Sequence, residues 1–442
     1  MRNRSTNRSL AALLATTALL AAPAAAQETP TEILFWHAMG AALGERVEAI
    51  AEDFNESQED YAVTPVYKGN YTETMTAAIA AFRAGQQPHV VQVFEVGTAT
   101  MMAAEGAIRP VYEIMEKAED VDFDPDAYLP AVKSYYTTTD GRMLSLPFNS
   151  STPVLWYNED LLAEAGIEEP PATWTEMFEA AAALKEASHD CAFSFGWQSW
   201  VMIENYLAWH DEPIGTMENG FGGFGTELLI DRNPEHAALL QRIADSQADG
   251  TFEYGGRRGD SLPLFTSGEC AMWMNSSAYY AGISEQAEFA FGQSFLPLDE
   301  DLASEPQNSI IGGATLWTLA GHEDADYDGV AAFFAYLSSP EVQAEWHQGT
   351  GYVPITTAAY ELSREQGFYE ENPGTDTAIR QLSLNEPTPN SKGLRFGSFV
   401  QIRDVINEEL ERLWAGEQTA EEALANSAAR GNALLREFEQ TN

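Results

Sequence analysis

The sequence is poor in basic residues. Its 442 residues include 23 lysines and arginines against 68 aspartates and glutamates, which gives a formal charge of −45 at pH 7. Nonspecific nucleic-acid binding requires a basic surface, so this class of function is close to excluded. An acidic protein also does not adhere to anionic membranes. We therefore expect neither nucleic acid nor a lipid surface as a partner.

Long apolar runs are missing after the N-terminus. Residues 10–22 form an apolar run that is too short to span a membrane. Arginines precede it at positions 2, 4 and 8, and Ala24-Ala25-Ala26 follows it as an A-x-A cleavage site, which is the pattern of a secretory signal peptide. We expect residues 1–26 to be removed on export, and a retained membrane anchor is the alternative.

Cysteine is scarce as well, since Cys191 and Cys270 are the only two. An oxidising compartment permits a disulfide between them. Each opens an apolar, strand-like run, so we expect the bridge, with two buried thiols as the alternative. Seven scattered histidines without an H-E-x-x-H or C-x-x-C motif predict no metal site and no cofactor.

Motifs of catalysis and of nucleotide binding are also lacking. The sequence has no G-x-S-x-G elbow, no G-x-x-x-x-G-K-[S/T] loop and no G-x-G-x-x-G after a predicted strand. Among so many acids, nothing singles out the carboxylate pair of a glycoside hydrolase. An exported chain without such motifs is typical of a binding protein, so we predict no enzyme activity.

Strand-like and helix-like segments alternate along the chain. Strands are predicted over 33–37, 61–67 and 90–94, with helices between them, and this alternation predicts an α/β fold with parallel-rich sheets flanked by helices. A second unit begins near residue 150, and no Pro/Ser-rich linker separates it from the first. Capping boxes predict helix starts after Asn70, Thr173, Ser398 and Thr419.

Polar residues follow several predicted strands, at the sheet edge where open α/β folds bind ligands. Glu95 follows the strand 90–94 directly, and Gly312-Gly313 would let a ligand approach backbone N–H groups. A solvated acid and a tight turn are the alternatives for these positions. The further candidates of this kind are Tyr71, Asn149 to Thr152, Ser276 and Ser277.

The stretch from Thr388 to Arg403 is basic in an otherwise acidic chain. It contains Lys392, Arg395 and Arg403 and no acid. The predicted helix after Ser398 places Arg403 in its opening turns, and an arginine at a helix N-terminus favours an anion site. Pairing of these cations with surface carboxylates is the alternative.

Six strings carry a resemblance: 35–39 (FWHAM), 67–71 (YKGNY), 94–102 (FEVGTATMM), 146–154 (LPFNSSTPV), 310–314 (IIGGA) and 350–355 (TGYVPI). They resemble the periplasmic sn-glycerol-3-phosphate-binding proteins of Ugp-type ABC importers. The resemblance continues through 364–369, 393–395 and 401–403 and covers essentially the whole mature chain. It implies a two-lobed periplasmic-binding-protein (Venus-flytrap) fold with mixed, mostly parallel sheets and a ligand cleft between the lobes. The implied division is 27–148 plus about 312–357 for lobe 1, and about 149–311 plus 358–442 for lobe 2.

The resemblance also implies the ligand contacts. They are Tyr71, Glu95, Ser151, Ser276, Gly313, Tyr352 and Arg403, with Trp174, Ser277 and Arg395 as further candidates. In this interpretation Arg403 pairs with the phosphate, and Glu95 accepts hydrogen bonds from the glycerol hydroxyls. Trp174 is otherwise a packing residue at the start of its helix.

The function implied by the resemblance is capture of sn-glycerol 3-phosphate, and of glycerophosphodiesters such as glycerophosphocholine, by a periplasmic monomer. The ligand passes to the permease subunits of an ABC transporter, whose ATPase subunits are separate chains. A binding protein for maltodextrins or other sugars and a secreted glycerophosphodiester hydrolase are the alternatives.

Overall fold

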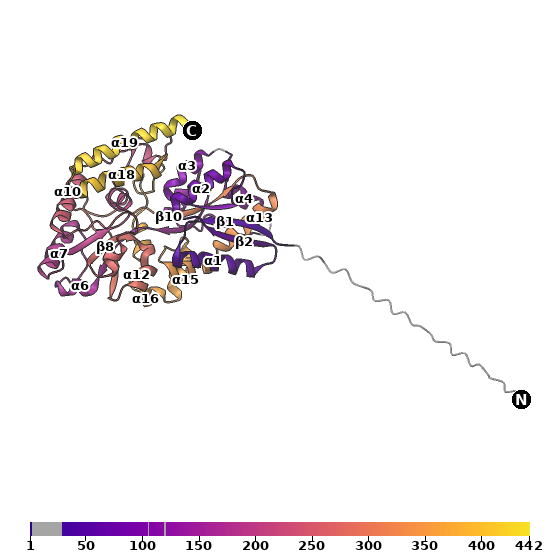
Figure 1. The fold of residues 1–442 in the computed structure, drawn as a ribbon, viewed down its shortest axis with the longest axis horizontal. Helices are drawn as coiled ribbons and strands as arrows, with labels where there is room; N and C mark the ends of the chain where they lie inside the picture. Colours follow the sequence, from indigo (N-terminus) through magenta and orange to yellow (C-terminus); the bar gives the residue numbers. More distant parts are fainter. Residues whose placement is uncertain (2–28, 105, 119–120) are drawn as a thin grey trace.

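The computed structural model describes Met1 and residues 29–104, 106–118 and 121–442. The expected signal peptide therefore lies outside the described residues. The described chain forms two lobes side by side, each built on one β-sheet with helices on its faces (Figure 1). No helix in these described ranges is long and apolar enough to cross a membrane.

The sheet of the first lobe has the strand order β2-β1-β3-β10-β4, and β5 pairs with β10 beside β4. Its central strand β3 is buried along its whole length, in agreement with its sequence VVQVF. The strands are β1 (Thr31–His37), β2 (Tyr61–Tyr67), β3 (Val90–Phe94), β4 (Ile108–Arg109), β5 (Leu146–Ser151) and β10 (Gly312–Leu319).

The sheet of the second lobe has the strand order β7-β8-β6-β9. Its strand β8 is likewise buried throughout, and it carries the apolar run CAMWM. The strands are β6 (Pro153–Asn158), β7 (Cys191–Phe195), β8 (Cys270–Ser276) and β9 (Phe291–Ser294).

Strand pairing corrects one expectation from the sequence. In the described part of the chain, β1–β2, β1–β3 and β7–β8 are parallel, whereas the other five strand pairs are antiparallel. The sheets are therefore mixed but not mostly parallel. In the first sheet, β10 enters from the second lobe and runs against β3, β4 and β5, and in the second sheet β6 runs against β8 and β9.

Two chain segments that cross between the lobes lie side by side. The chain leaves the first sheet after Ser151 and enters the second at Pro153, so that only Thr152 separates β5 from β6. The hydroxyl of Thr152 donates to Ser309 Oγ at 2.7 Å and lies 3.1 Å from the carbonyl oxygen of Ile310, on the segment that returns to β10. Sheet membership thus changes a few residues after the expected boundary at residue 148.

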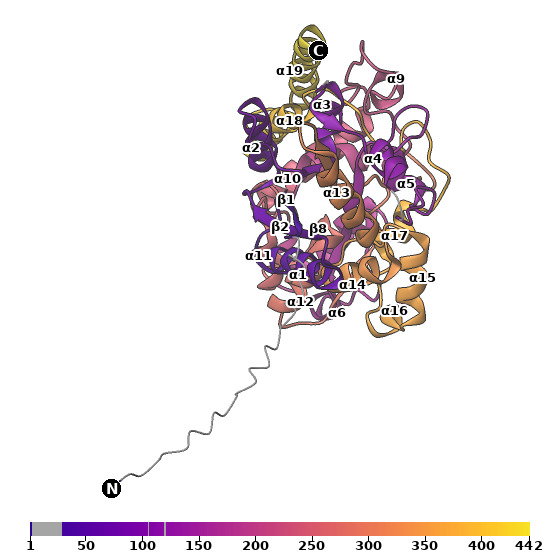
Figure 2. The same ribbon diagram turned by 90° about the vertical axis from the view of Figure 1, so that its right-hand side faces the viewer.

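The helices of the first lobe flank its sheet and lie near its edges (Figure 2). Helix α2 begins at the predicted capping box, in which Asn70 and Glu73 cap each other's backbone N–H groups. The helices are α1 (Ala41–Ser57), α2 (Tyr71–Arg83), η1 (Glu95–Gly97), α3 (Thr98–Ala103), α4 (Val111–Lys117), α5 (Pro130–Lys133), η2 (Ser134–Tyr136), α13 (Asp324–Leu337), α14 (Pro340–Thr350) and α15 (Thr357–Glu365). The next helix, α16 (Phe368–Glu371), lies against the second lobe, where Tyr280 donates to Asn372 at its end.

The helices of the second lobe include a π-helical segment, η3, between β7 and α8. The bounds are α6 (Glu159–Glu164), α7 (Trp174–Glu186), η3 (Trp200–Asn205), α8 (Tyr206–Trp209), α9 (Thr216–Asn219), α10 (Pro234–Asp249), α11 (Leu262–Thr266), η4 (Ser277–Tyr279), α12 (Tyr280–Gln286), α17 (Thr377–Leu382), α18 (Phe399–Trp414) and α19 (Ala420–Thr441).

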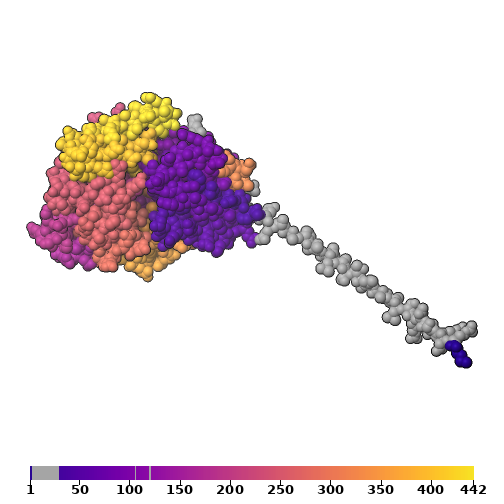
Figure 3. All heavy atoms as spheres, viewed as in Figure 1, coloured from indigo at the N-terminus to yellow at the C-terminus, as the bar shows by residue number. Residues whose placement is uncertain are grey.

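The C-terminal helices α18 and α19 pack on each other and on α10 of the second lobe. Figure 3 shows this yellow segment lying over the second lobe and reaching the first lobe, where α18 contacts η1. Thr419 and Glu422 form the predicted capping box of α19. Ser398 does not cap α18, because it adopts a left-handed conformation with φ of 52° and accepts no capping hydrogen bond.

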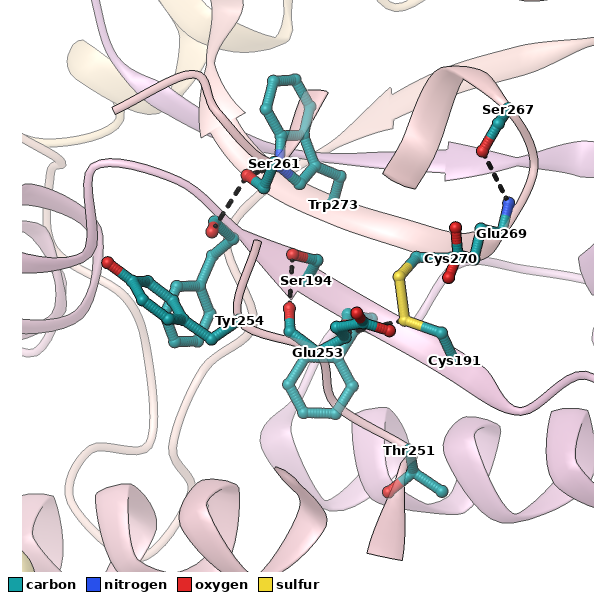
Figure 4. The surroundings of a disulfide bond; sticks show 12 residues. Cys191, Ser194, Thr251, Glu253, Tyr254, Ser261, Ser267, Glu269, Cys270 and Trp273 are labelled. Carbon is teal, nitrogen blue, oxygen red and sulfur yellow. Dashed lines mark hydrogen bonds between the residues drawn. A yellow bond between two sulfur atoms is a disulfide. The ribbon is translucent and has the colours of Figure 1, made fainter. Parts of the chain in front are cut away.

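Cys191 and Cys270 form the expected disulfide in the second lobe (Figure 4). They are the first residues of β7 and β8, and parallel pairing places them directly opposite each other with their Cα atoms 4.6 Å apart. This separation is suited to a disulfide. The bridge therefore ties together two strands whose cysteines are 79 residues apart in sequence.

Candidate functional site

A cavity of about 380 Å³ lies between the lobes. All seven residues expected to contact ligand line it, together with residues that the sequence did not indicate. Tyr71, Glu95, Ser151, Gly313 and Tyr352 belong to the first lobe, whereas Ser276 and Arg403 belong to the second. A ligand in this cavity would therefore contact both lobes.

Most of these residues lie at or near the ends of strands and helices that border the cavity. Glu95 follows the last residue of β3, Ser151 ends β5, and Ser276 ends β8. Tyr71 is the first residue of α2, and Arg403 lies in the second turn of α18. The positions match the general location of ligand sites beyond strand ends in open α/β folds.

Arg403 forms ion pairs with two carboxylates, those of Glu95 and Glu204, and the sequence did not indicate Glu204. Its Nε and Nη2 donate to the two carboxylate oxygens of Glu204 at 2.6 and 2.7 Å, and Nη2 also lies 2.6 Å from Oε1 of Glu95. The three side chains are almost completely buried. Glu204 lies in η3, next to α18 in the second lobe, so the pair with Glu95 is the contact that crosses between the lobes.

The electrostatics of this triad are set by burial and by the opposed charges. Burial raises the pKa of Glu204 to about 6, although Arg403 opposes the shift. Burial also raises the pKa of Glu95, again against the effect of Arg403. Burial acts to lower the pKa of Arg403, but Glu204 and Glu95 outweigh it and hold that pKa above its ordinary value. Arg403 is therefore charged at any pH at which the protein is folded.

The guanidinium of Arg403 still has donors to offer. Of its five N–H groups, Glu204 and Glu95 occupy the one on Nε and the two on Nη2. The two on Nη1 have no partner among the described residues, and Arg403 lines the cavity. With both carboxylates ionised the triad carries a net charge of −1, so it is suited to a neutral hydrogen-bonding group better than to a second anion.

A chain of amide groups orients Tyr71 at the other side of the cavity. The backbone N–H of Ala38 donates to Gln92, whose Nε2 donates to Asn149, whose Nδ2 donates to the phenol oxygen of Tyr71 at 3.0 Å. The oxygen of Tyr71 is thus an acceptor for Asn149, and its hydroxyl is also hydrogen-bonded to the hydroxyl of Tyr352. Burial raises the pKa of Tyr71 and of Tyr352, so both phenols stay protonated.

Gly313 occupies a position that favours glycine for two reasons. Its φ is 100°, and an added Cβ would collide with the carbonyl oxygen of Asn149 on the neighbouring strand β5. Its backbone N–H also donates a hydrogen bond to the carboxylate of Glu95, which partly opposes the rise in the Glu95 pKa that burial causes. The Gly-Gly pair therefore serves both the strand pairing and the placement of Glu95.

Two tryptophans complete the cavity wall. Trp197 and Trp200 line it, and Trp200 packs over Gly312, where no larger residue would fit. Trp197 has a φ of 45°, a rare conformation for a bulky residue, and it directly precedes the helical turns that carry Trp200 and Glu204. Trp197 ends a strand expected over 192–197, so its place at a strand end could have indicated it, whereas no sequence pattern singles out Trp200 or Glu204.

The three further candidates do not line the cavity. Trp174 is buried in the core of the second lobe, where it contacts Phe178 and Phe193. Ser277 is buried and does not line the cavity, whereas its neighbour Ser276 does. Arg395 donates to the carbonyl oxygens of Ser134 and Tyr135 instead.

One group of potential metal ligands assembles elsewhere among the described residues, from His89, His322 and Asp326. The backbone N–H of Leu34 donates to Nδ1 of His89 at 2.8 Å, so the proton of the neutral ring is on Nε2, which faces Asp326. A metal on Nε2 would require the proton to move to Nδ1, where the N–H of Leu34 already points. The hydrogen bonding therefore favours a histidine–aspartate contact over a metal site.

Comparison with known proteins places the chain in a family. Residues 49–377 match the family model described as bacterial extracellular solute-binding protein. The chain belongs to this family. Its relatives include sn-glycerol-3-phosphate-binding periplasmic proteins UgpB from Yersinia pseudotuberculosis, 50% identical over 93% of this chain and 94% of the relative, and from Pectobacterium atrosepticum, 48% identical over 94% of each. The resemblance carried by the sequence strings is confirmed.

Solved structures of extracellular solute-binding proteins share the fold at low sequence identity. The UgpB of Mycobacterium tuberculosis in complex with glycerophosphocholine has a TM-score of 0.76 and 21% identity, over 92% of this chain and 98% of that one. The cyclic α-maltosyl-1,6-maltose binding protein of Arthrobacter globiformis has a TM-score of 0.73, over 92% and 100%. The two-lobed binding-protein fold expected from the sequence is confirmed.

Proposed function

We propose that this solute-binding protein is the periplasmic subunit of an ABC importer that captures sn-glycerol 3-phosphate and glycerophosphodiesters and delivers them to a membrane permease. The observation that carries the proposal is the convergence of Tyr71, Glu95, Ser151, Ser276 and Arg403 on one cavity between two lobes. The names of relatives about 50% identical to the chain support it.

The Glu95–Arg403 pair is the site for the glycerol hydroxyls. The carboxylate of Glu95 accepts a hydrogen bond from one hydroxyl, while Nη1 of Arg403 donates a hydrogen bond to the oxygen of the neighbouring hydroxyl. Two adjacent hydroxyls match one acceptor and one donor held side by side. This placement revises the expected Arg403–phosphate contact, because the carboxylates of Glu204 and Glu95 already neutralise the guanidinium and would repel a phosphate.

The phosphate binds at the hydroxyl donors of Tyr71, Tyr352, Ser151 and Ser276. No side-chain hydrogen bond to another described residue occupies the Ser151 hydroxyl, and the hydroxyls of Tyr71 and Tyr352 lie together at the same cavity. Tyr71 also stands at the N-terminus of α2, where the helix dipole favours an anion. Trp197 and Trp200 pack against the carbon chain of the ligand.

We infer that the protein binds its ligand without turning it over and that it reaches the periplasm through an N-terminal signal peptide. Calorimetry with glycerol 3-phosphate, glycerophosphocholine and maltose, followed by mass spectrometry of the recovered ligand, tests the binding. We expect stoichiometric binding of the two phosphate compounds, no binding of maltose and unchanged ligand mass. Maltose binding without phosphate-ester binding would overturn the assignment, and a released glycerol 3-phosphate product would favour the hydrolase alternative.

A further inference from the structure

The charged residues that line the cavity form two pairs of opposite sign, each divided between the lobes. Among the described residues they are Glu95 and Arg403 in the interior, and Arg46 and Glu285 at the mouth, which are both exposed. The interior pair is in contact. The mouth pair makes no ion pair, either with each other or with any other residue in the described ranges, so its two charges remain available.

A glycine leaves space for the side chain of Arg46 at the mouth. Its guanidinium lies over Gly349 of α14, and a Cβ at that position would collide with the guanidinium nitrogens. The same guanidinium borders a neighbouring surface hollow with Glu341 and Glu345, yet neither carboxylate comes within ion-pair distance. The glycine therefore provides the space that the guanidinium occupies beside the cavity, in a protein with a large excess of acid.

Small residues surround the mouth on both lobes. Helix α1 contributes Ala41 and Ala42, and α12 contributes Ala281 and Gly282. Both helices contact α14, and Figure 2 shows α1, α12 and α14 grouped at one end of the molecule. The mouth thus has room for a further chemical group, flanked by a cation from one lobe and an anion from the other.

We propose that Arg46 and Glu285 form a head-group subsite that favours glycerophosphodiesters whose second alcohol carries both an ammonium and a carboxylate group. The proposal rests on the function proposed above, in which the glycerol and the phosphate occupy the interior, and it adds that the second ester oxygen points outward. Glu285 attracts the ammonium group and Arg46 attracts the carboxylate. A cationic head group without a carboxylate gains only the contact with Glu285 and meets repulsion from Arg46.

The expected effects are modest because both side chains are exposed. An exposed charge pair changes affinity by about twofold to fivefold, and it weakens with salt. Dissociation constants should therefore be measured at low ionic strength, as ratios between ligands on the same protein. Ratios remove any general effect of a substitution on folding or on net charge.

The test uses calorimetry on the full mature chain with glycerol 3-phosphate, glycerophosphocholine and glycerophosphoserine. The variants are R46Q and E285Q, with R83Q and E288Q as matched controls that remove the same charges from exposed positions outside the cavity lining. We expect R46Q to lower the preference for glycerophosphoserine over glycerophosphocholine by about threefold. E285Q should weaken both diesters relative to glycerol 3-phosphate by a similar factor, and the controls should leave all ratios unchanged.

The outcomes separate this inference from the function on which it rests. Ratios in R46Q and E285Q equal to those in R83Q and E288Q, in a protein that binds glycerol 3-phosphate, would overturn the head-group subsite alone. A wild-type protein that binds none of the three compounds would overturn the proposed function and the subsite together.

Discussion

The guanidinium of Arg403 and the carboxylate of Glu95 lie 2.6 Å apart and join the two lobes at the floor of the cavity. Arg403 is also fixed by Glu204 within its own lobe, so the position of its guanidinium does not depend on the first lobe. Glu95 of the first lobe therefore contacts a cation that is also held within the second lobe. The pair forms one hydrogen-bonding surface from two lobes.

Glu95→Gln should weaken binding of glycerol 3-phosphate by about tenfold to a hundredfold, because it replaces a charged acceptor for a ligand hydroxyl by a neutral amide. Propyl phosphate, which has no hydroxyls, should lose far less affinity for the same variant. Calorimetry with both ligands checks this. Equal losses for the two ligands would place the phosphate, not the glycerol, beside Glu95.

Arg403→Ala should lower the free energy of unfolding by about 3–5 kcal/mol, since it leaves two carboxylates buried without their cation. Urea denaturation measures the loss. Arg403→Lys should recover only part of it, because a lysine cannot reproduce the two-pronged contact with Glu204. A stability of Arg403→Ala within about 1 kcal/mol of wild type would show that the carboxylates become protonated or solvated at little cost.

Gly313→Ala should destabilise the protein by about 2–3 kcal/mol and weaken ligand binding, because both the positive φ and the collision with Asn149 oppose a side chain. Gly223→Ala is the matched control, since Gly223 has nearly the same φ, 98°, with nothing near an added Cβ. The difference between the two variants isolates the collision. Melting temperatures and ligand affinities that match between them would contradict this account.

Alkylation of the exported protein in urea without reductant should label neither cysteine, whereas two buried thiols would both react once the protein unfolds. The double variant with alanine at 191 and 270 should lose about 2–4 kcal/mol of stability, because the bridge closes a long loop in the unfolded chain. Mass spectrometry after alkylation and urea denaturation are the two measurements. Two labelled thiols in the unfolded, unreduced protein would contradict the disulfide.

Stability should fall as pH drops below about 6.5, in part through His236. Burial lowers the pKa of His236 to about 3, and its Nε2 contacts the carbonyl oxygen of Met202 at 2.7 Å. Below pH 6.5 His236 binds a proton in the unfolded state but not in the folded state. The contribution of His236 to stability is therefore present at pH 7 and is lost progressively toward pH 3. Between pH 7 and pH 5.5 this loss is about 1 kcal/mol.

His236→Gln, which keeps a donor for Met202, should remove that part of the pH dependence. Urea denaturation of the variant and of the wild type at pH 7 and pH 5.5 gives the difference directly. Burial raises the pKa of Glu204, which makes stability rise as the pH falls, the opposite of the His236 effect. This contribution is the same in both proteins and cancels in the comparison. An identical pH dependence in the two proteins would show that His236 already titrates in the folded state.

The sequence alone predicted the elements that depend on near neighbours in the chain. The helix from Phe399 to Trp414 and the capping boxes at Asn70 and Thr419 agree with the structure, because helix periodicity and capping involve residues three or four apart. The same local logic failed at Ser398, where the left-handed backbone turns the side chain away from the helix start.

The sequence also determined the seven residues expected around the ligand, through its resemblance to a known family, and the structure collects all seven at one cavity. Their roles as ligand contacts remain predictions. What local patterns could not supply was the partner of Arg403. Glu204 is 199 residues away from it, and nothing in its neighbourhood distinguishes it from the other acids of the chain.

Only the tertiary structure decided which residues meet. It placed Trp197 and Trp200 at the cavity and Trp174 in the core, although all three are tryptophans close to helix starts. It also gave β10 its antiparallel direction, because the chain returns to the first sheet from the other lobe. Spacing along the chain specifies which face of a helix or strand is apolar. The partner of a buried charge, in contrast, depends on how distant segments pack. Burying a charged side chain costs free energy, and only an opposite charge brought next to it by the fold can offset that cost.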